Sequence, residues 1–315
     1  MQGYILRRLI QIVPSLFLAS ILIFLIIYLS PGDPAVILLG PDATPGAVRA
    51  MQERLGLDRP LYEQYLLWLS RVFQLDLGKS FLNGAPVWNL ILLKLPATVE
   101  LAVAAMLLSM AVAFPLGLTA AVRRGSRLDY FVTGFNALSL AIPTFFLGML
   151  LILAFTLQLG WLPPGGRGDL FGDPPRALRH LLLPAVCLAI PLGAVVSRYV
   201  RSATIDVLSQ DYIRTARSKG LSERIVLSRH AVRNSLIPVV TILGVQFGHL
   251  LGGAVVVESV FDWPGLGKMV LYSVLSKDYT VVQGTLLFVV TVFLLMNLCI
   301  DLLYTVLDPR VRHGD

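Results

Sequence analysis

The residues of this chain that could do chemistry are few and scattered. Gly78, Lys79 and Ser80 look like the end of a phosphate-binding loop, but that loop needs a glycine five residues earlier, where Phe73 stands. The histidines are too far apart in sequence to have metal-ligand spacing, and they are His180, His230, His249 and His313. We therefore predict no catalytic residue, no metal site and no cofactor bound by this chain.

Three carboxylic acids fall within or beside strongly apolar runs, where a charge is costly and often functional. Glu100 and Glu258 lie near the predicted outer ends of such runs, and Asp301 lies near the inner end of the last one. A proton-coupled carrier would place carboxylates deep in a pathway and would show an inverted repeat, and neither feature is seen. This pattern disfavours a stand-alone secondary carrier, which is the alternative from a different functional class.

One apolar run carries a regular pattern of small residues. Gly244, Gly248 and Gly252 recur every four residues, so one helix face would expose bare backbone that another helix can approach closely. Gln246 and His249 lie away from that face. These two side chains either hydrogen-bond to a neighbouring helix or line a polar translocation path, and the sequence leaves both interpretations open.

The composition requires lipid as the solvent for these residues. Of 315 residues, 56% are hydrophobic and 14% are charged, and the mean hydropathy is +0.75, which exceeds what a soluble domain of this size can bury. Six apolar runs approach the roughly 20 residues that cross a bilayer. They cover residues 9–30, 97–122, 130–159, 181–203, 236–258 and 284–307. We predict an all-α, polytopic membrane protein with six transmembrane helices.

The distribution of basic residues gives the orientation. If the amino terminus is cytoplasmic, the segments between spans on the cytoplasmic side hold most of the closely spaced basic residues, including a cluster over residues 198–233. The others are Arg7, Arg8, Arg123, Arg124, Arg127, Arg310 and Arg312. By the positive-inside rule, both termini and this cluster are cytoplasmic. The net charge of +7 follows from this asymmetry, so no nucleic-acid partner is needed to explain it.

The chain divides into three predicted parts. Residues 1–30 form an uncleaved transmembrane helix, residues 31–95 an extracytoplasmic loop with short helices at 44–55 and 60–73, and residues 96–315 a core of five transmembrane helices. Within that core a cytoplasmic loop covers about 204–235. Proline and glycine predict non-helical turns at 161–166 and 173–175, a short helix at 268–276, and helix breaks at Pro143 and Pro191.

The cytoplasmic loop contains a cationic, helix-prone segment on which another protein could push. This segment is similar to the coupling loop of ATP-binding cassette (ABC) importer permeases, which usually reads Glu-Ala-Ala-x-x-x-Gly. Ala216 and Gly220 match that pattern, whereas Arg214 replaces the glutamate. The replacement is expected of the dipeptide, oligopeptide and nickel branch, and it puts any family ion pair at that position in doubt.

Other segments resemble the first permease subunit of that branch, in the same order and spacing. They lie at residues 4–9, 29–34, 55–61, 95–101, 257–267, 301–304 and 307–310. The resemblance implies the ABC type I importer permease fold, in a bacterial or archaeal inner membrane. It also implies a coupling site made by Arg214, Thr215, Ala216, Arg217, Lys219, Gly220 and Leu221.

The partners implied by the resemblance are a second homologous permease, two ATP-binding subunits that hold ATP and magnesium, and an extracytoplasmic binding protein. The cargo implied is a short peptide, a dipeptide or an oligopeptide. Relatives with this architecture also import nickel, glutathione or oligosaccharides, so these cargoes stay open. Whether the two permeases and the two ATPases are distinct or identical also stays open.

Overall fold

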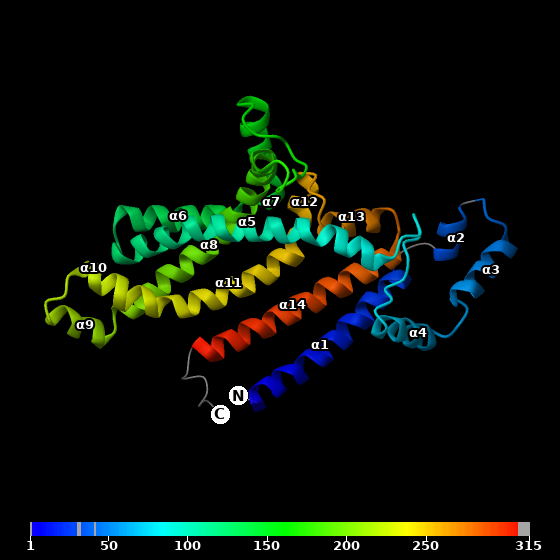
Figure 1. The fold of residues 1–315 in the computed structure, drawn as a ribbon, viewed down its shortest axis with the longest axis horizontal. Coiled ribbons are helices and arrows are strands. Elements are labelled where there is room, and N and C mark those ends of the chain that lie inside the picture. Colours follow the sequence, from blue (N-terminus) through cyan, green and yellow to red (C-terminus); the bar gives the residue numbers. More distant parts are fainter. Residues whose placement is uncertain (1, 30–32, 41, 308–315) are drawn as a thin grey trace.

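A computed structural model describes residues 2–29, 33–40 and 42–307 (Figure 1). Throughout these residues the regular elements are helices, and Lys79 and Pro86 form an isolated antiparallel bridge. Four helices are long and apolar enough to cross a membrane. They are α1 (Gln2–Leu29), α5 (Val87–Val122), α8 (Pro174–Leu208) and α14 (Tyr279–Leu307).

Two further candidate spans are bent. The first consists of α6 (Arg127–Ala141) followed by α7 (Thr144–Leu151) and the π-helix η1 (Ile152–Gln158), with a bend of 102°. The second runs from Glu223 to Leu250 with a bend of 45°. The described part of the chain thus has four straight candidate spans, or six when each bent pair counts as one, and six is the predicted number.

Proline explains the sharper bend. Pro143 has no N–H to continue the helical ladder, and the preceding Ile142 has extended backbone angles, φ −80° and ψ 123°. The predicted break at Pro143 is confirmed, and the segment of α7 and η1 rises at a steep angle to the long helices in Figure 1. Pro191 behaves differently, because α8 continues through it without interruption.

One predicted turn is wrong. Pro174 and Pro175 were expected outside helices, but they are the first residues of α8. Proline is tolerated in the first turn because that N–H has no intrahelical acceptor. Asp173 caps the helix by accepting a hydrogen bond from the backbone N–H of Arg176 at 3.2 Å. The predicted turn at 161–166 is confirmed as non-helical.

Three short helices form an outer layer at one end of the molecule (Figure 1). They are α2 (Pro34–Leu39), α3 (Pro45–Leu55) and α4 (Leu61–Phe73). Thr44 caps α3, and Gly56 ends it in the left-handed conformation at φ 70°. The helices predicted at 44–55 and 60–73 are confirmed, each to within one residue.

The second half of the chain alternates short and long helices. The loop predicted to be cytoplasmic contains α9 (Asp211–Ser218), α10 (Glu223–Ile225) and the π-helix η2 (Val226–Val232), which lead into α11 (Arg233–Gly253). After α11 come α12 (Val255–Val260) and α13 (Leu266–Leu275), the latter close to the helix predicted at 268–276. In Figure 1, α9 and α10 lie at the opposite end from α2, α3 and α4.

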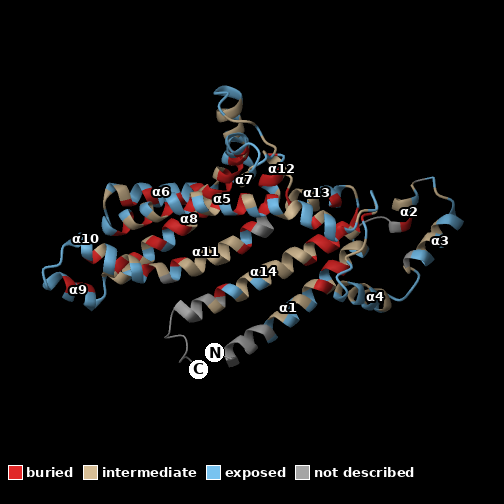
Figure 2. Cartoon of the chain, viewed as in Figure 1, coloured by how far each residue is buried: buried red, intermediate tan, exposed pale blue. Residues whose placement is uncertain are grey.

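The core is centred on α5 and α8, where buried residues concentrate in Figure 2. Side chains from α11 and α12 complete this core. The backbones of α5 and α8 come close at Gly117, where an added Cβ would lie 2.5 Å from the carbonyl oxygen of Ser197. Only glycine fits at such a crossing, so this contact fixes α5 against the helix that leads to the cytoplasmic loop.

Candidate functional site

The short helix α9, in the loop predicted to be cytoplasmic, has one face packed against the chain. Ile213 and Ala216, three residues apart, are buried and join Val226 and Ala231 in a small apolar cluster. Val207 and Leu208, at the end of α8, pack against the same cluster. α9 is therefore supported by the end of α8 and by η2.

The other face of α9 is open. Arg214, Thr215, Arg217 and Lys219 are exposed, and Arg214 pairs only loosely with Asp211, with the Nη1 and Oδ1 atoms 3.6 Å apart. Such an exposed pair adds little stability. Among the predicted coupling residues, the structure thus places Ala216 inward as a support, and it leaves the cationic residues exposed.

The end of α9 is shaped by Gly220. Its φ of +77° lies in the left-handed region that favours glycine, and its N–H donates to the carbonyl of Arg217 at 2.9 Å. Arg217 then pairs with Glu223 across this turn, with distances of 2.7 and 3.2 Å for its two hydrogen bonds. The Glu223 carboxylate raises the pKa of the Arg217 guanidinium. Sequence reasoning missed Glu223, whose opposite charge six residues from Arg217 was the available signal.

On α11, the glycines face α14. A Cβ at Gly244 would lie 2.4 Å from Cγ1 of Ile300, and one at Gly248 would lie 3.0 Å from Cδ2 of Phe293. α14 therefore packs against bare backbone at both positions. The surroundings of Gly252 lie outside the described residues.

Gln246 and His249 lie on the same helix. Neither side chain has a hydrogen bond within the part of the chain that the structure describes, where His249 is exposed and its ring lies 5.6 Å from that of Phe293. A hydrogen bond to a neighbouring helix of this chain is thus not seen there.

A buried polar cluster joins α5, α12 and the start of α13. The Glu258 carboxylate is fully buried and accepts hydrogen bonds from the Thr98 hydroxyl at 2.7 Å and the Lys268 backbone N–H at 2.9 Å. The Trp263 indole N–H donates to the carbonyl of Ala97 at 2.8 Å. α12 lies beyond the candidate spans. Burial of its Glu258 carboxylate raises the pKa of that group, and the hydrogen bonds from Lys268 and Thr98 oppose the shift. Glu258 was expected near a span end, where it could reach the interface, and is instead enclosed.

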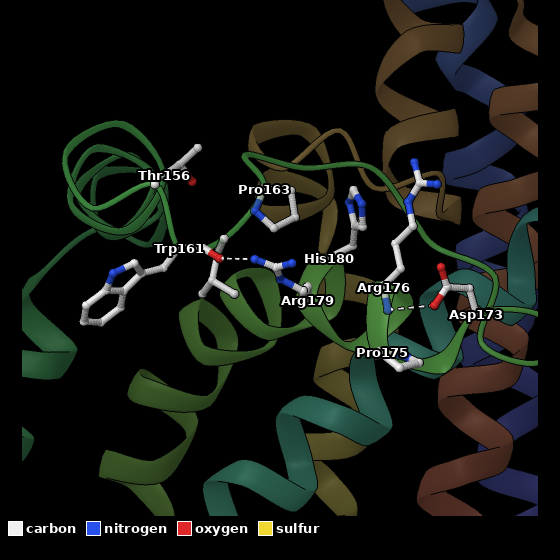
Figure 3. Close-up of a pocket in the computed structure, with 10 residues that line it drawn as sticks. Thr156, Trp161, Pro163, Asp173, Pro175, Arg176, Arg179 and His180 are labelled. Carbon is white, nitrogen blue, oxygen red and sulfur yellow. Dashed lines mark hydrogen bonds between the residues drawn. The ribbon is translucent and has the colours of Figure 1, made fainter.

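Figure 3 shows a hollow between η1 and the beginning of α8. The Arg179 guanidinium donates to the carbonyl of Trp161 at 2.9 Å, and a His180 ring nitrogen lies 2.7 Å from the carbonyl oxygen of Gly165. These bonds hold the loop at 159–173 against α8. Within the described residues, His180 and the other groups form no cluster of three or more metal ligands.

Comparison with known proteins identifies the family. The model of the binding-protein-dependent transport system inner membrane component matches residues 113–313, and the model of the amino-terminal region of this membrane component matches residues 1–102. The chain belongs to this family. It is a permease subunit of an ABC importer.

Relatives match along the whole chain. The glutathione transport system permease protein GsiC of Escherichia coli O6:H1 (strain CFT073) is 40% identical over 99% of this chain and 100% of its own length. A putative peptide transport system permease protein of Brucella abortus (strain 2308) is 42% identical over the same shares. Among solved structures, the inward-facing MetNI methionine ABC transporter matches 70% of this permease and 96% of the solved chain, with TM-score 0.59 and 17% identity. That likeness shows the fold.

The family gives the site its context. A membrane component of a binding-protein-dependent system is a transport subunit, so the phosphate-loop fragment at Gly78 needs no catalytic interpretation. In this permease the described features sort by position along the molecule. The α9 surface lies at one end, the glycine face of α11 lies among the spans, and α12, which carries Glu258, lies near the middle beside α7 and α13 (Figure 1).

Proposed function

We propose that this permease imports short peptides, forming the pathway together with a second, related permease. The observation that carries the cargo proposal is the 40% and 42% identity, along nearly the full chain, to permeases named for glutathione and peptide transport. Glutathione is a tripeptide, so both names describe one chemical class. Nickel and oligosaccharides are the remaining alternatives.

Coupling is assigned to the exposed face of α9. Two ATP-binding subunits would hold ATP and magnesium, and one of them would receive α9 in a surface cleft. The arrangement supports this role because Ile213 and Ala216 fix the helix to the end of α8, while Arg214, Thr215 and Lys219 remain free to contact a partner. A push on this helix would reach α8 directly.

The orientation follows from the same proposal. The beginning of α1 and the end of α14 point toward the end of the molecule that carries α9 (Figure 1), so both termini would be cytoplasmic. The outer helices α3 and α4 would then face the binding protein. Gln246 and His249, which lack partners within the described chain, would line the peptide path.

The test uses the assembled importer in liposomes, with its ATPases and its binding protein. Thr215→Trp enlarges the open face of α9 without entering the apolar cluster, so we expect peptide uptake to fall at least about tenfold while the chain stays inserted. Ser228→Trp, at an exposed position of η2, is the matched control. Full uptake by the Thr215 variant would refute the coupling site, and uptake of nickel but not of dipeptides, tripeptides or glutathione would refute the cargo.

A further inference from the structure

We propose that Asp129 and Arg201 are positioning residues for coupling, which make α6 move with α8 when an ATPase displaces α9. This inference rests on the function proposed above for α9. Neither residue contacts cargo or nucleotide in it. Their role is to fix the angle between two helices whose other ends reach different parts of the permease.

The contact between the two side chains is bidentate. The Arg201 Nε and Nη2 atoms donate to the two carboxylate oxygens of Asp129 at 2.6 and 2.9 Å. The Asp129 side chain is nearly buried, at 5% exposed, and the Arg201 side chain is 29% exposed. Two parallel hydrogen bonds between planar groups fix orientation as well as distance. Such a pair resists rotation of α6 against α8 more than a single hydrogen bond would.

Asp129 also organises the turn before its own helix. Its second oxygen accepts the N–H of Gly125 at 3.0 Å, and its own N–H donates to the Ser126 hydroxyl at 3.3 Å. The turn between α5 and α6 is therefore tied to the same carboxylate that receives Arg201. Through Asp129, three helices (α5, α6 and α8) share one fixed point at the cytoplasmic end.

Arg201 is close to the coupling helix along the chain. It lies two helical turns before Leu208, where α8 ends, and α9 begins at Asp211. Since Val207 and Leu208 pack against the apolar cluster beneath α9, the end of α8 and α9 form one body. A displacement of α9 is thus delivered to α8 within a short distance of Arg201.

A second polar contact between α6 and α8 lies one helical turn before Arg201. The Asn136 side-chain amide donates to the Ser197 hydroxyl at 3.2 Å, and both groups are buried. Ser197 and Arg201 are four residues apart and thus on one face of α8. Two points of attachment on the same face prevent α6 from pivoting about the ion pair.

From α6 the contacts continue outward. The Cys187 thiol of α8 donates to the carbonyl of Thr144 at 3.4 Å, and an added Cβ at Gly148 of α7 would lie 3.1 Å from the Phe261 ring. The bend at Pro143 thus has supports on both sides. The ion pair of Asp129 and Arg201 is the first of these contacts on the cytoplasmic side, and the series of contacts leads from α9 toward α12.

The experiment compares matched ion pairs in the assembled importer. Asp129→Asn and Arg201→Lys, which keeps the charge but loses the two-pronged geometry, are each reconstituted with the ATPases and binding protein. We expect normal assembly and nucleotide hydrolysis but about 2- to 30-fold fewer peptides transported per ATP. The double variant Asp129→Arg with Arg201→Asp reverses the ion pair and should recover part of the lost number of peptides transported per ATP. Glu100→Gln, which removes the 2.7 Å pair with Arg167, should leave it unchanged.

The outcomes separate this inference from the proposed function. If Thr215→Trp blocks uptake while Asp129→Asn and Arg201→Lys keep the normal ratio, the positioning role is refuted and the coupling site stands. If Thr215→Trp has no effect, the coupling site itself is refuted. Should Asp129→Asn fail to assemble, Arg201→Lys alone decides, because its charge keeps the buried carboxylate paired. The inference would also be overturned if Glu100→Gln lowered the number of peptides transported per ATP as much as Arg201→Lys does.

Discussion

At the scale of single residues, Glu258 is a fully buried acid with hydrogen bonds to both carboxylate oxygens. Its carboxylate oxygens satisfy donors from α5 and from the start of α13, which are separated by most of the chain. An added Cβ at Gly265 would lie 2.1 Å from one of these oxygens, so the turn at 261–265 wraps tightly around the acid. The group therefore holds three elements together rather than taking part in transport chemistry.

We predict that Glu258→Ala destabilises the permease by about 2 kcal/mol or more, because it leaves buried donors at Thr98 and Lys268 without acceptors. Glu258→Gln keeps one acceptor oxygen in the same place and should cost less than half as much. Thermal unfolding of the purified permease in detergent measures both. Asp262→Asn, which changes an exposed ion pair with Lys268, serves as the control and should shift the unfolding temperature little. Equal effects of the Ala and Gln variants would contradict the prediction.

The sequence located Glu258 in a recognisable segment but did not reveal its surroundings. The hydrogen bond from Thr98 joins residues separated by 160 positions, and no local spacing encodes such a contact. By contrast, the positive φ of Gly220 is a local requirement that favours glycine, and the glycine itself is visible in the sequence. Local backbone needs were readable from the sequence, whereas long-range polar pairs such as Asp129 with Arg201 were not.

At the scale of elements, helix ends were predicted best where the residues that cap the helix or turn the chain lie directly beside it in the sequence. Thr44 and Gly56 mark both ends of α3. The error at Pro174 came from treating proline as a helix breaker where it stands in the first turn. The 102° angle after Pro143 could not be predicted, because a missing N–H permits a bend but tertiary packing sets its size.

The contact between α11 and α14 gives a prediction at this scale. In Gly244→Ala, the new methyl group would meet Ile300 at 2.4 Å, so helix separation must increase at a cost of about 1 to 3 kcal/mol. We expect a lower unfolding temperature, partly restored by adding Ile300→Val. Gly134→Ala, at a helical glycine with no atom within 4 Å of the added Cβ, is the control. A loss in Gly134→Ala as large as in Gly244→Ala would contradict close packing as the cause.

At the scale of the whole molecule, the permease has a different kind of contact surface at each end. The end that carries α9 has exposed cationic residues on a short supported helix. The outer end carries α4, which packs on α1 through Tyr65 and Trp68, whose rings lie 5.4 and 5.8 Å from that of Phe24. The Ser20 and Tyr65 hydroxyls are also hydrogen-bonded at 2.8 Å. The layer of short helices is thus attached to α1 through α4.

The outer layer can be tested without disturbing this attachment. α3 can be replaced by a short glycine-serine linker across residues 45–55, because the aromatic contacts with α1 come from α4. If α3 helps to receive the binding protein, the assembled importer should keep its basal ATP hydrolysis and lose most of the stimulation that the binding protein gives. Trp68→Ala weakens the packing of α4 on α1, so it should lower the unfolding temperature in addition to the stimulation by the binding protein. Unchanged stimulation in the linker variant would show that the binding protein is received elsewhere, since the rest of the outer end is left intact.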